Sequence, residues 1–374
     1  MGRMFLWVTL SLTLQMGREP SIPTAARVEA AVRAWHEAGR FHGAVLVADR
    51  GEVIWEGGFG PAVREWECPN GPTVRYPIAS LTKQFTAVLT MQLVEQGRLD
   101  LDATVGSALP SFPPDAGRRI RVRHLLAHSS GLPETPVEHY FDRSDDAESV
   151  EWVLERTARG DLRFEPGSSF GYTNTDYHVL QAILEEVTGR PYEELVRSRI
   201  VEPLGLRDTG IARRDAVIPR LASDYVRVGE GWERTPPYRW ENWGGAGALY
   251  STVRDLHRWN RALVDHELIT TDTTARMFTP QDGAGPYVAL GSWVYPRRIP
   301  GTDFAPTLIE RHGAIGGFSS LDLIDAERKQ WIVILANDGD ISFHDTAWAE
   351  CLSLDLLRVL YGAAPTGPAT AEER

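Results

Sequence analysis

Apolar residues near the N-terminal end follow first a helical and then a strand-like spacing. Residues 24–39 carry apolar side chains three and four positions apart, which predicts a helix. Two mostly apolar runs follow, at 43–48 and 53–55, and each is typical of a strand. The segment Asp49-Arg50-Gly51-Glu52 joins them and is typical of a turn. The pattern therefore predicts a helix followed by a β-hairpin.

The middle of the chain is dominated by helical spacing. A helical pattern begins at Ser80 and continues to about residue 97. Further helices are expected between about 115 and 265, where Gly and Pro residues separate them. The clearest of these segments are 146–158, 175–188, 192–200 and 252–264.

Strand-like runs return after residue 285. They occur at 288–294, 318–324 and 331–336. A last helix is expected at about 344–361, with Trp348, Leu352, Leu356 and Leu360 facing inward. Because strands occur towards both ends, we predict an α+β fold with one antiparallel sheet built from both termini and flanked by helices. The middle of the chain would then be a mostly helical subdomain, inserted over one edge of the sheet.

These patterns place a single domain at residues 27–362. Its sheet region is expected at about 27–79 and 285–362, and its helical region at about 80–284. Residues 363–374 are small, polar and unpatterned, so we expect a disordered tail there.

The first 26 residues allow two interpretations. Arg3 precedes the apolar run 4–14, as in a secretory signal, and Thr24-Ala25-Ala26 offers small residues for cleavage. Alternatively, Met16 is the true first residue. We favour export, to a periplasmic or extracellular location, over a cytoplasmic one.

Composition excludes several classes of partner. The net charge is −12 and no basic stretch is interleaved with aromatic residues, which argues against nucleic acid and anionic membrane surfaces. No run approaches the roughly 20 apolar residues that span a bilayer.

Cys68 and Cys351 lie far apart in the sequence, which excludes a disulfide framework and a cysteine-based zinc site. A single bridge between them is one alternative, and two free buried thiols are the favoured one. The oligomeric state is left open.

The choice of basic residues draws attention to one position. Lys and Arg together number 39, but only Lys83 and Lys329 are lysines. Arginine stays protonated in proteins, whereas burial or a neighbouring cation can make a lysine neutral. Lys329 precedes an apolar run and fits an ordinary turn residue. Lys83 lies three residues after Ser80, which suggests a titratable amine.

Ser80-Leu81-Thr82-Lys83 matches the S-x-x-K motif. Residues three apart share a helical face, so the hydroxyl and the amine can meet. The alternative is a plain helix cap at Ser80 with Lys83 on the surface. From the motif alone, the two interpretations are about equally supported.

Two later segments favour the catalytic interpretation. Tyr172-Thr173-Asn174 lies in a glycine-rich loop before a helix, and a phenol near a lysine can relay a proton from a serine. Arg311-His312-Gly313-Ala314 lies between strand-like runs, where it supplies a cation and an approachable backbone N–H. Taken alone, these segments would be a packing tyrosine and a glycine-rich turn.

Together, these motifs resemble the penicillin-recognising serine hydrolases, in their class C β-lactamase-like branch. That branch includes class C β-lactamases, D,D-peptidases and family VIII esterases. The resemblance covers roughly residues 27–362, in the family's order and spacing. Three further stretches resemble the same family, namely 78–87, 125–132 and 245–252.

The resemblance implies a role for each motif residue. Ser80 would be the nucleophile that forms an acyl-enzyme, and Lys83 and Tyr172 would share the general-base and general-acid roles. Asn174 would hydrogen-bond substrate or Lys83. The oxyanion hole would be the backbone N–H groups of Ser80 and Ala314. No cofactor and no metal is implied.

The third motif departs from the family pattern. Lys-Thr-Gly or His-x-Gly is usual, whereas Arg311-His312-Gly313 stands here. Arg311 fills the basic position if no residue is deleted, and otherwise His312 fills it. Either way Lys-Thr-Gly is missing, so we favour an esterase or peptidase over a dedicated β-lactamase or D,D-carboxypeptidase. A non-catalytic binding protein on the same fold is the alternative from another functional class.

Trp240, Trp243 and Tyr250 are candidates for lining an acyl pocket, although packing is their default role.

Two other patterns suggest different chemistry and are weaker. Gly167-Ser168-Ser169-Phe170-Gly171 spells the G-x-S-x-G nucleophile elbow, but that elbow needs a strand directly before it and a helix directly after it. His124 and His128 are spaced as metal ligands on a helix, but no carboxylate partner accompanies them. We expect His128 to be buried and hydrogen-bonded, holding the next loop.

Overall fold

A computed structural model describes residues 24–140, 152–154, 161–213, 215–229, 231–235, 239–339 and 351–368. Its centre is a six-stranded sheet in the order β10-β11-β12-β13-β1-β2, in which every neighbouring pair is antiparallel. The strands are β1 (Gly43–Asp49), β2 (Glu52–Phe59), β10 (Trp293–Pro296), β11 (Thr307–Ile315), β12 (Phe318–Asp325) and β13 (Gln330–Ala336). The predicted antiparallel sheet, with strands from both ends of the chain, is confirmed.

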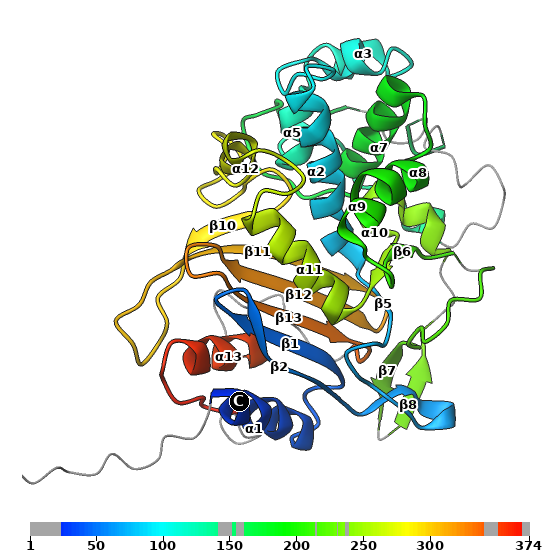
Figure 1. Ribbon diagram of the computed structural model, residues 1–374. Helices are drawn as coiled ribbons and strands as arrows, with labels where there is room; N and C mark the ends of the chain where they lie inside the picture. Colours follow the sequence, from blue (N-terminus) through cyan, green and yellow to red (C-terminus); the bar gives the residue numbers. More distant parts are fainter. Residues whose placement is uncertain are drawn as a thin grey trace, which may run out of the picture.

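Helices cover both faces of this sheet (Figure 1). On one face lie α1 (Thr24–Glu37) and α13 (Leu352–Leu360), and α11 (Val253–Val264) crosses the other. Val45 and Val47 of β1 lie in the hydrophobic core under α1 and α13. Ala44 and Leu46 lie in the core on the opposite face, under α11. Burial on both faces explains why β1 is a continuous apolar run without alternation.

The helical region shares the core on the α11 side of the sheet, and its helices surround α2. Its helices are α2 (Thr82–Glu95), α3 (Val105–Ala108), α4 (Pro114–Gly117), α5 (Val122–Leu126), α7 (Thr175–Thr188), α8 (Tyr192–Val196), α9 (Glu202–Leu204), α10 (Gly244–Gly247) and α12 (Thr271–Met277). Single turns are η1 (Arg64–Trp66), η2 (Ala79–Leu81), η3 (Val137–Tyr140), η5 (Arg197–Val201) and η6 (Trp240–Trp243). The predicted α+β fold is thus confirmed.

Short strands connect the two regions. They are β3 (Pro61–Val63) with β4 (Cys68–Pro69), β5 (Tyr76–Pro77) and β6 (Gly210–Ile211) on either side of β9 (Leu249–Ser251), and the hairpin of β7 (Tyr225–Val228) and β8 (Gly231–Arg234). The ladder of β5, β9 and β6 matters most for function, because β5 leads directly into the turn that carries Ser80.

Two strand predictions were wrong. The strand expected at 288–294 is β10, which begins only at Trp293. No strand was expected over 307–315, where β11 lies. Glu310 and Arg311 are buried in the middle of β11, so this strand lacks the apolar pattern on which the prediction depended.

Some predictions fall partly or wholly outside the described residues. Of the helix expected at 146–158, only 152–154 are described, and they are helical. Of the helix expected at 344–361, residues 344–350 and thus Trp348 are not described, while Leu352 and Leu356 of α13 are buried. The leader at 1–26, the tail at 363–374 and the domain boundaries stay predictions. In the ranges given above, no helix is long and apolar enough to cross a membrane.

Both cysteines are free, but only one is buried. Cys351 precedes α13 inside the core, whereas Cys68 lies exposed on β4. The prediction of free thiols is confirmed, and the prediction that both are buried was wrong for Cys68.

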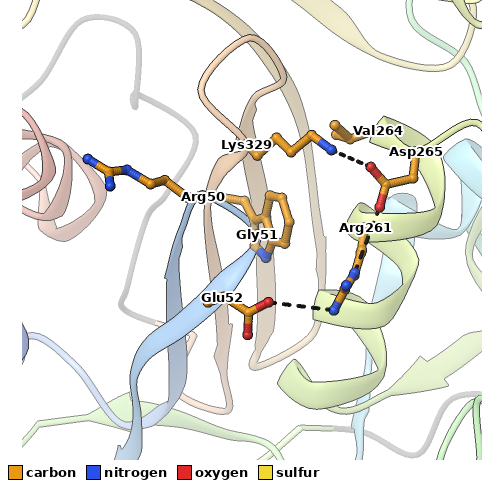
Figure 2. A pocket seen from close by; sticks show the side chains of 8 residues that line it. Arg50, Gly51, Glu52, Arg261, Val264, Asp265 and Lys329 are labelled. Carbon is orange, nitrogen blue, oxygen red and sulfur yellow. Dashed lines mark hydrogen bonds and ion pairs between the residues drawn. The ribbon is translucent and has the colours of Figure 1, made fainter.

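Lys329 proves to be the turn residue that its sequence context indicates. It lies between β12 and β13 with a φ of 52°, and its Nζ pairs with Asp265 Oδ1 at 2.6 Å. Figure 2 shows this pair in a small surface pocket, where Glu52 points toward Arg261 and Arg50 points away from them. The lysine charge here is paired on an exposed surface, so it gives no reason to expect a neutral amine.

Candidate active site

Ser80 lies in the turn η2, which runs without a break into α2. The residue before it, Ala79, has a φ of +50°, a conformation that non-glycine residues rarely adopt and that is often found at functional sites. Since α2 is buried on nearly every side, Lys83 in its first turn is fully enclosed. The sequence therefore places a lysine inside the protein, one helical turn from a partly exposed serine.

Lys83 Nζ has three neighbours at hydrogen-bonding distance. It lies 3.0 Å from Ser80 Oγ, 2.7 Å from Asn174 Oδ1 and 2.7 Å from the Ala246 carbonyl oxygen. The last two groups can only accept hydrogen bonds. A neutral amine has two N–H bonds and one lone pair, so donating to both acceptors leaves the lone pair directed at Ser80 Oγ. This is the geometry that a general base for Ser80 requires.

The surroundings of Lys83 favour the neutral amine. Its pKa is lowered to about 8, chiefly by burial and also by the Arg311 guanidinium, while Tyr172 acts in the opposite direction. A substantial fraction of Lys83 is therefore neutral near pH 8, as a base needs to be.

Tyr172 completes a triangle around Ser80. Its hydroxyl donates to Ser80 Oγ at 2.7 Å and accepts from the Arg311 guanidinium at 3.3 Å. Burial by itself raises the pKa of Tyr172, but the nearby charges of Lys83 and Arg311, together with the polar contacts to Lys83 and Ser80, outweigh it and lower the pKa. Lys83 and Tyr172 thus form a coupled pair whose proton can move towards either group.

Of the two candidates for the basic position of the third motif, Arg311 contacts the serine and the tyrosine. Its Nε donates to the Ser80 carbonyl oxygen at 2.9 Å, and its guanidinium lies 4.6 Å from the Trp293 ring centre. His312 lies at the pocket in front of Ser80, with Nδ1 2.7 Å from Glu310 and its ring stacked on Trp293. This arrangement agrees with the alignment that needs no deletion.

Gly313 allows β11 to pass directly against the turn that carries Ser80. A Cβ on Gly313 would lie 2.5 Å from Ser80 N and 2.6 Å from the Ile78 carbonyl oxygen, which no side chain can occupy. The close approach brings Ala314 to the same pocket as Ser80. All eight site residues predicted from the sequence are therefore brought together.

Comparison with known proteins agrees with this geometry. A family model described as Beta-lactamase matches residues 27–351. The chain belongs to the Beta-lactamase family. It is a serine hydrolase of that family, and the predicted resemblance is confirmed.

Relatives within the family have different activities by name. A penicillin-binding protein of Bacillus subtilis is 25% identical over 361 residues, which cover 90% of this chain and 77% of that protein. A D-aminopeptidase of Gluconobacter oxydans is 30% identical, over 68% of this chain and 48% of its own. The structure of a D-stereospecific amidohydrolase from Streptomyces aligns with a TM-score of 0.71 and 25% identity, over 92% of this chain and 99% of that one.

The pocket in front of the serine of this Beta-lactamase family member has a volume of about 380 Å³ and a largely aromatic wall. Its lining residues are Ser80, Phe170, Tyr172, Asn174, Trp243, Trp293, His312, Gly313 and Ala314. Of the three aromatic candidates for an acyl pocket, Trp243 lines it. Trp240 packs against Phe318 and Tyr250 against Gly210, which is the packing role given above as their default.

Sequence reasoning missed three residues of the site. Phe170 and Trp293 line the pocket, and Glu134 binds Asn174 from outside it. Phe170 stands two residues before Tyr172, so the tyrosine motif could have indicated it. Nothing in the local pattern around Trp293 or Glu134 points to the site, because the fold alone brings them there.

The two weaker patterns have structural explanations. Ser169 is exposed in an irregular loop, with no strand before it and with α7 beginning only at Thr175, so it is not a nucleophile elbow. His128 is buried beside Tyr172, and its Nδ1 lies 3.1 Å from Asp176, as the predicted loop-holding role requires. His124 Nδ1 accepts a hydrogen bond from the Arg121 backbone N–H at 3.2 Å.

Proposed function

We propose that this Beta-lactamase family member hydrolyses esters or amides through an acyl-enzyme on Ser80, as an esterase or peptidase. The observation that carries the proposal is the position of Ser80 Oγ, which lies 3.0 Å from Lys83 Nζ and 2.7 Å from the Tyr172 hydroxyl. An alcohol becomes a nucleophile at neutral pH when a base of suitable pKa can accept its proton. The enclosed amine and the coupled phenol supply such a base.

The reaction has two steps. In acylation, Ser80 Oγ attacks the carbonyl carbon while its proton passes to the Lys83–Tyr172 pair. The oxyanion accepts hydrogen bonds from the N–H groups of Ser80 and Ala314. The pair then returns the proton to the departing alcohol or amine, and the acyl group stays on Ser80. In deacylation, a water molecule attacks the acyl carbonyl, loses its proton to the same pair and releases the acid with Ser80 restored.

The pocket supports a preference for apolar substrates. Rings of Phe170, Trp243 and Trp293 surround the space in front of Ser80, which favours substrates with an apolar or aromatic group. Lys-Thr-Gly is absent, and this is the reason to expect weak hydrolysis of β-lactams. The names of the D-aminopeptidase and the amidohydrolase support amides as a second substrate class beside esters.

A substrate panel tests this preference. We expect the purified protein to hydrolyse p-nitrophenyl butyrate or D-alanine p-nitroanilide with a kcat/KM at least about 100-fold above that for a chromogenic cephalosporin, a difference of roughly 2.7 kcal/mol in transition-state stabilisation. Equal or faster turnover of the cephalosporin would instead identify a β-lactamase. Absence of turnover for all three substrates would favour a binding protein on the same fold.

A further inference from the structure

Glu134 contacts the active site from the side opposite Lys83. Its two carboxylate oxygens accept hydrogen bonds from the Asn174 backbone N–H at 3.2 and 3.1 Å. Oε1 also accepts from the Asn174 side-chain Nδ2 at 3.0 Å. Both donors of one residue are thus held by one carboxylate, at the point where Asn174 precedes α7.

This contact determines which way the Asn174 amide faces. A carboxylate can only accept hydrogen bonds, so Nδ2 must point to Glu134 and Oδ1 must point to Lys83. A flipped amide would place its oxygen against the carboxylate and its NH₂ group against Nζ. The acceptor that directs one Lys83 N–H away from Ser80 is therefore present only in the orientation that Glu134 enforces.

We propose that Glu134 is a positioning residue of the reaction, which locks the Asn174 amide so that the lone pair of neutral Lys83 faces Ser80. The proposal rests on the proposed function, since it needs Lys83 to act as a base for Ser80. Glu134 acts through Asn174, which lines the pocket, and is not itself one of the lining residues.

Its charge has a second consequence. The described charged and titratable groups around Lys83 include Tyr172, Tyr177, Arg311, Glu134, His128 and Asp176. Among these, the negative charge of Glu134 acts to raise the pKa of Lys83. Removing a negative charge makes deprotonation of both Lys83 and Tyr172 easier, so the pair should reach its active form at a lower pH.

The pH profile of kcat/KM for p-nitrophenyl butyrate tests this inference. In the wild type we expect kcat/KM to rise with pH along an acid limb whose midpoint lies near pH 8, because Lys83 must lose its proton. In Glu134→Gln we expect that limb to move about half a pH unit lower and the plateau to fall about tenfold. Glu134→Asp keeps the charge, so its limb should stay in place while its plateau falls.

Two control variants and a melting measurement keep the outcomes separate. Glu138→Gln removes the same charge four residues further on and should match the wild type in limb and plateau. A lower melting temperature for Glu134→Gln with an unchanged pH profile would mean that the carboxylate only stabilises the start of α7, which overturns the inference. Ser80→Ala reports on the proposed function separately: turnover that survives in it refutes that function, whereas an inactive Ser80→Ala beside an unaltered Glu134→Gln refutes this inference alone.

Discussion

We expect Ser80→Ala to lower kcat/KM for a p-nitrophenyl ester by at least about 10⁴-fold and to leave the fold unchanged. The substitution removes the atom that would form the acyl-enzyme and leaves Lys83 and Tyr172 in place. Ser80 is partly exposed at the pocket, so loss of its hydroxyl creates no cavity in the core. Steady-state kinetics and thermal melting measure the two effects.

Ser169→Ala is the matched control for this prediction. Ser169 lies exposed in the loop before Tyr172 and carries the competing G-x-S-x-G pattern. We expect its kcat/KM to stay within twofold of the wild type, a difference of roughly 0.4 kcal/mol. An inactive Ser169→Ala beside an active Ser80→Ala would reverse the assignment of the nucleophile.

We expect Lys83→Met to lower kcat/KM by about 10³-fold, because the thioether cannot accept the proton of Ser80. The methionine fits the enclosed volume of the lysine stem, and it removes the cost of burying an amine. Against this, Asn174 Oδ1 and the Ala246 carbonyl lose their donor, at about 1–3 kcal/mol each. We therefore expect folded protein with little activity, which circular dichroism and kinetics can establish together.

Lys329→Met is the matched control for Lys83→Met. It is the other lysine of the chain, and it pairs with Asp265 on the surface at 2.6 Å. An exposed pair of this kind contributes about 0–1 kcal/mol, so both activity and stability should change little. Wild-type turnover in Lys83→Met would show that Tyr172 alone serves as base.

The sequence predicted best those elements whose environment is uniform along their length. The helix expected at 175–188 has the same bounds as α7. Gly189, with a φ of 68°, follows its last residue and ends the helix. The strands β12 and β13 are buried over all their residues and were found within one residue of their bounds. In β13 continuous burial produces a nearly continuous apolar run, the kind of pattern on which such predictions depend.

β11 shows why the remainder could not be predicted. Glu310 and Arg311 are buried there beside polar partners. Arg311 binds the Ser80 carbonyl, far away in sequence, and Glu310 accepts hydrogen bonds from Tyr295 and from the nearby His312. Polar residues that are satisfied only by tertiary contacts leave no periodic signal. The motif residues of the site were predicted by family resemblance, whereas Glu134 and Trp293 have no motif and needed the fold.

Covalent labelling of the nucleophile tests the central claim most directly. The protein is incubated with a fluorophosphonate, whose phosphorus bonds to an activated serine oxygen as fluoride departs, and is then digested and mapped by tandem mass spectrometry. Our account predicts one adduct per chain on Ser80, lost in Ser80→Ala and much slower to form in Lys83→Met. An adduct on Ser169, or an unlabelled Ser80 in protein that hydrolyses esters, would contradict it.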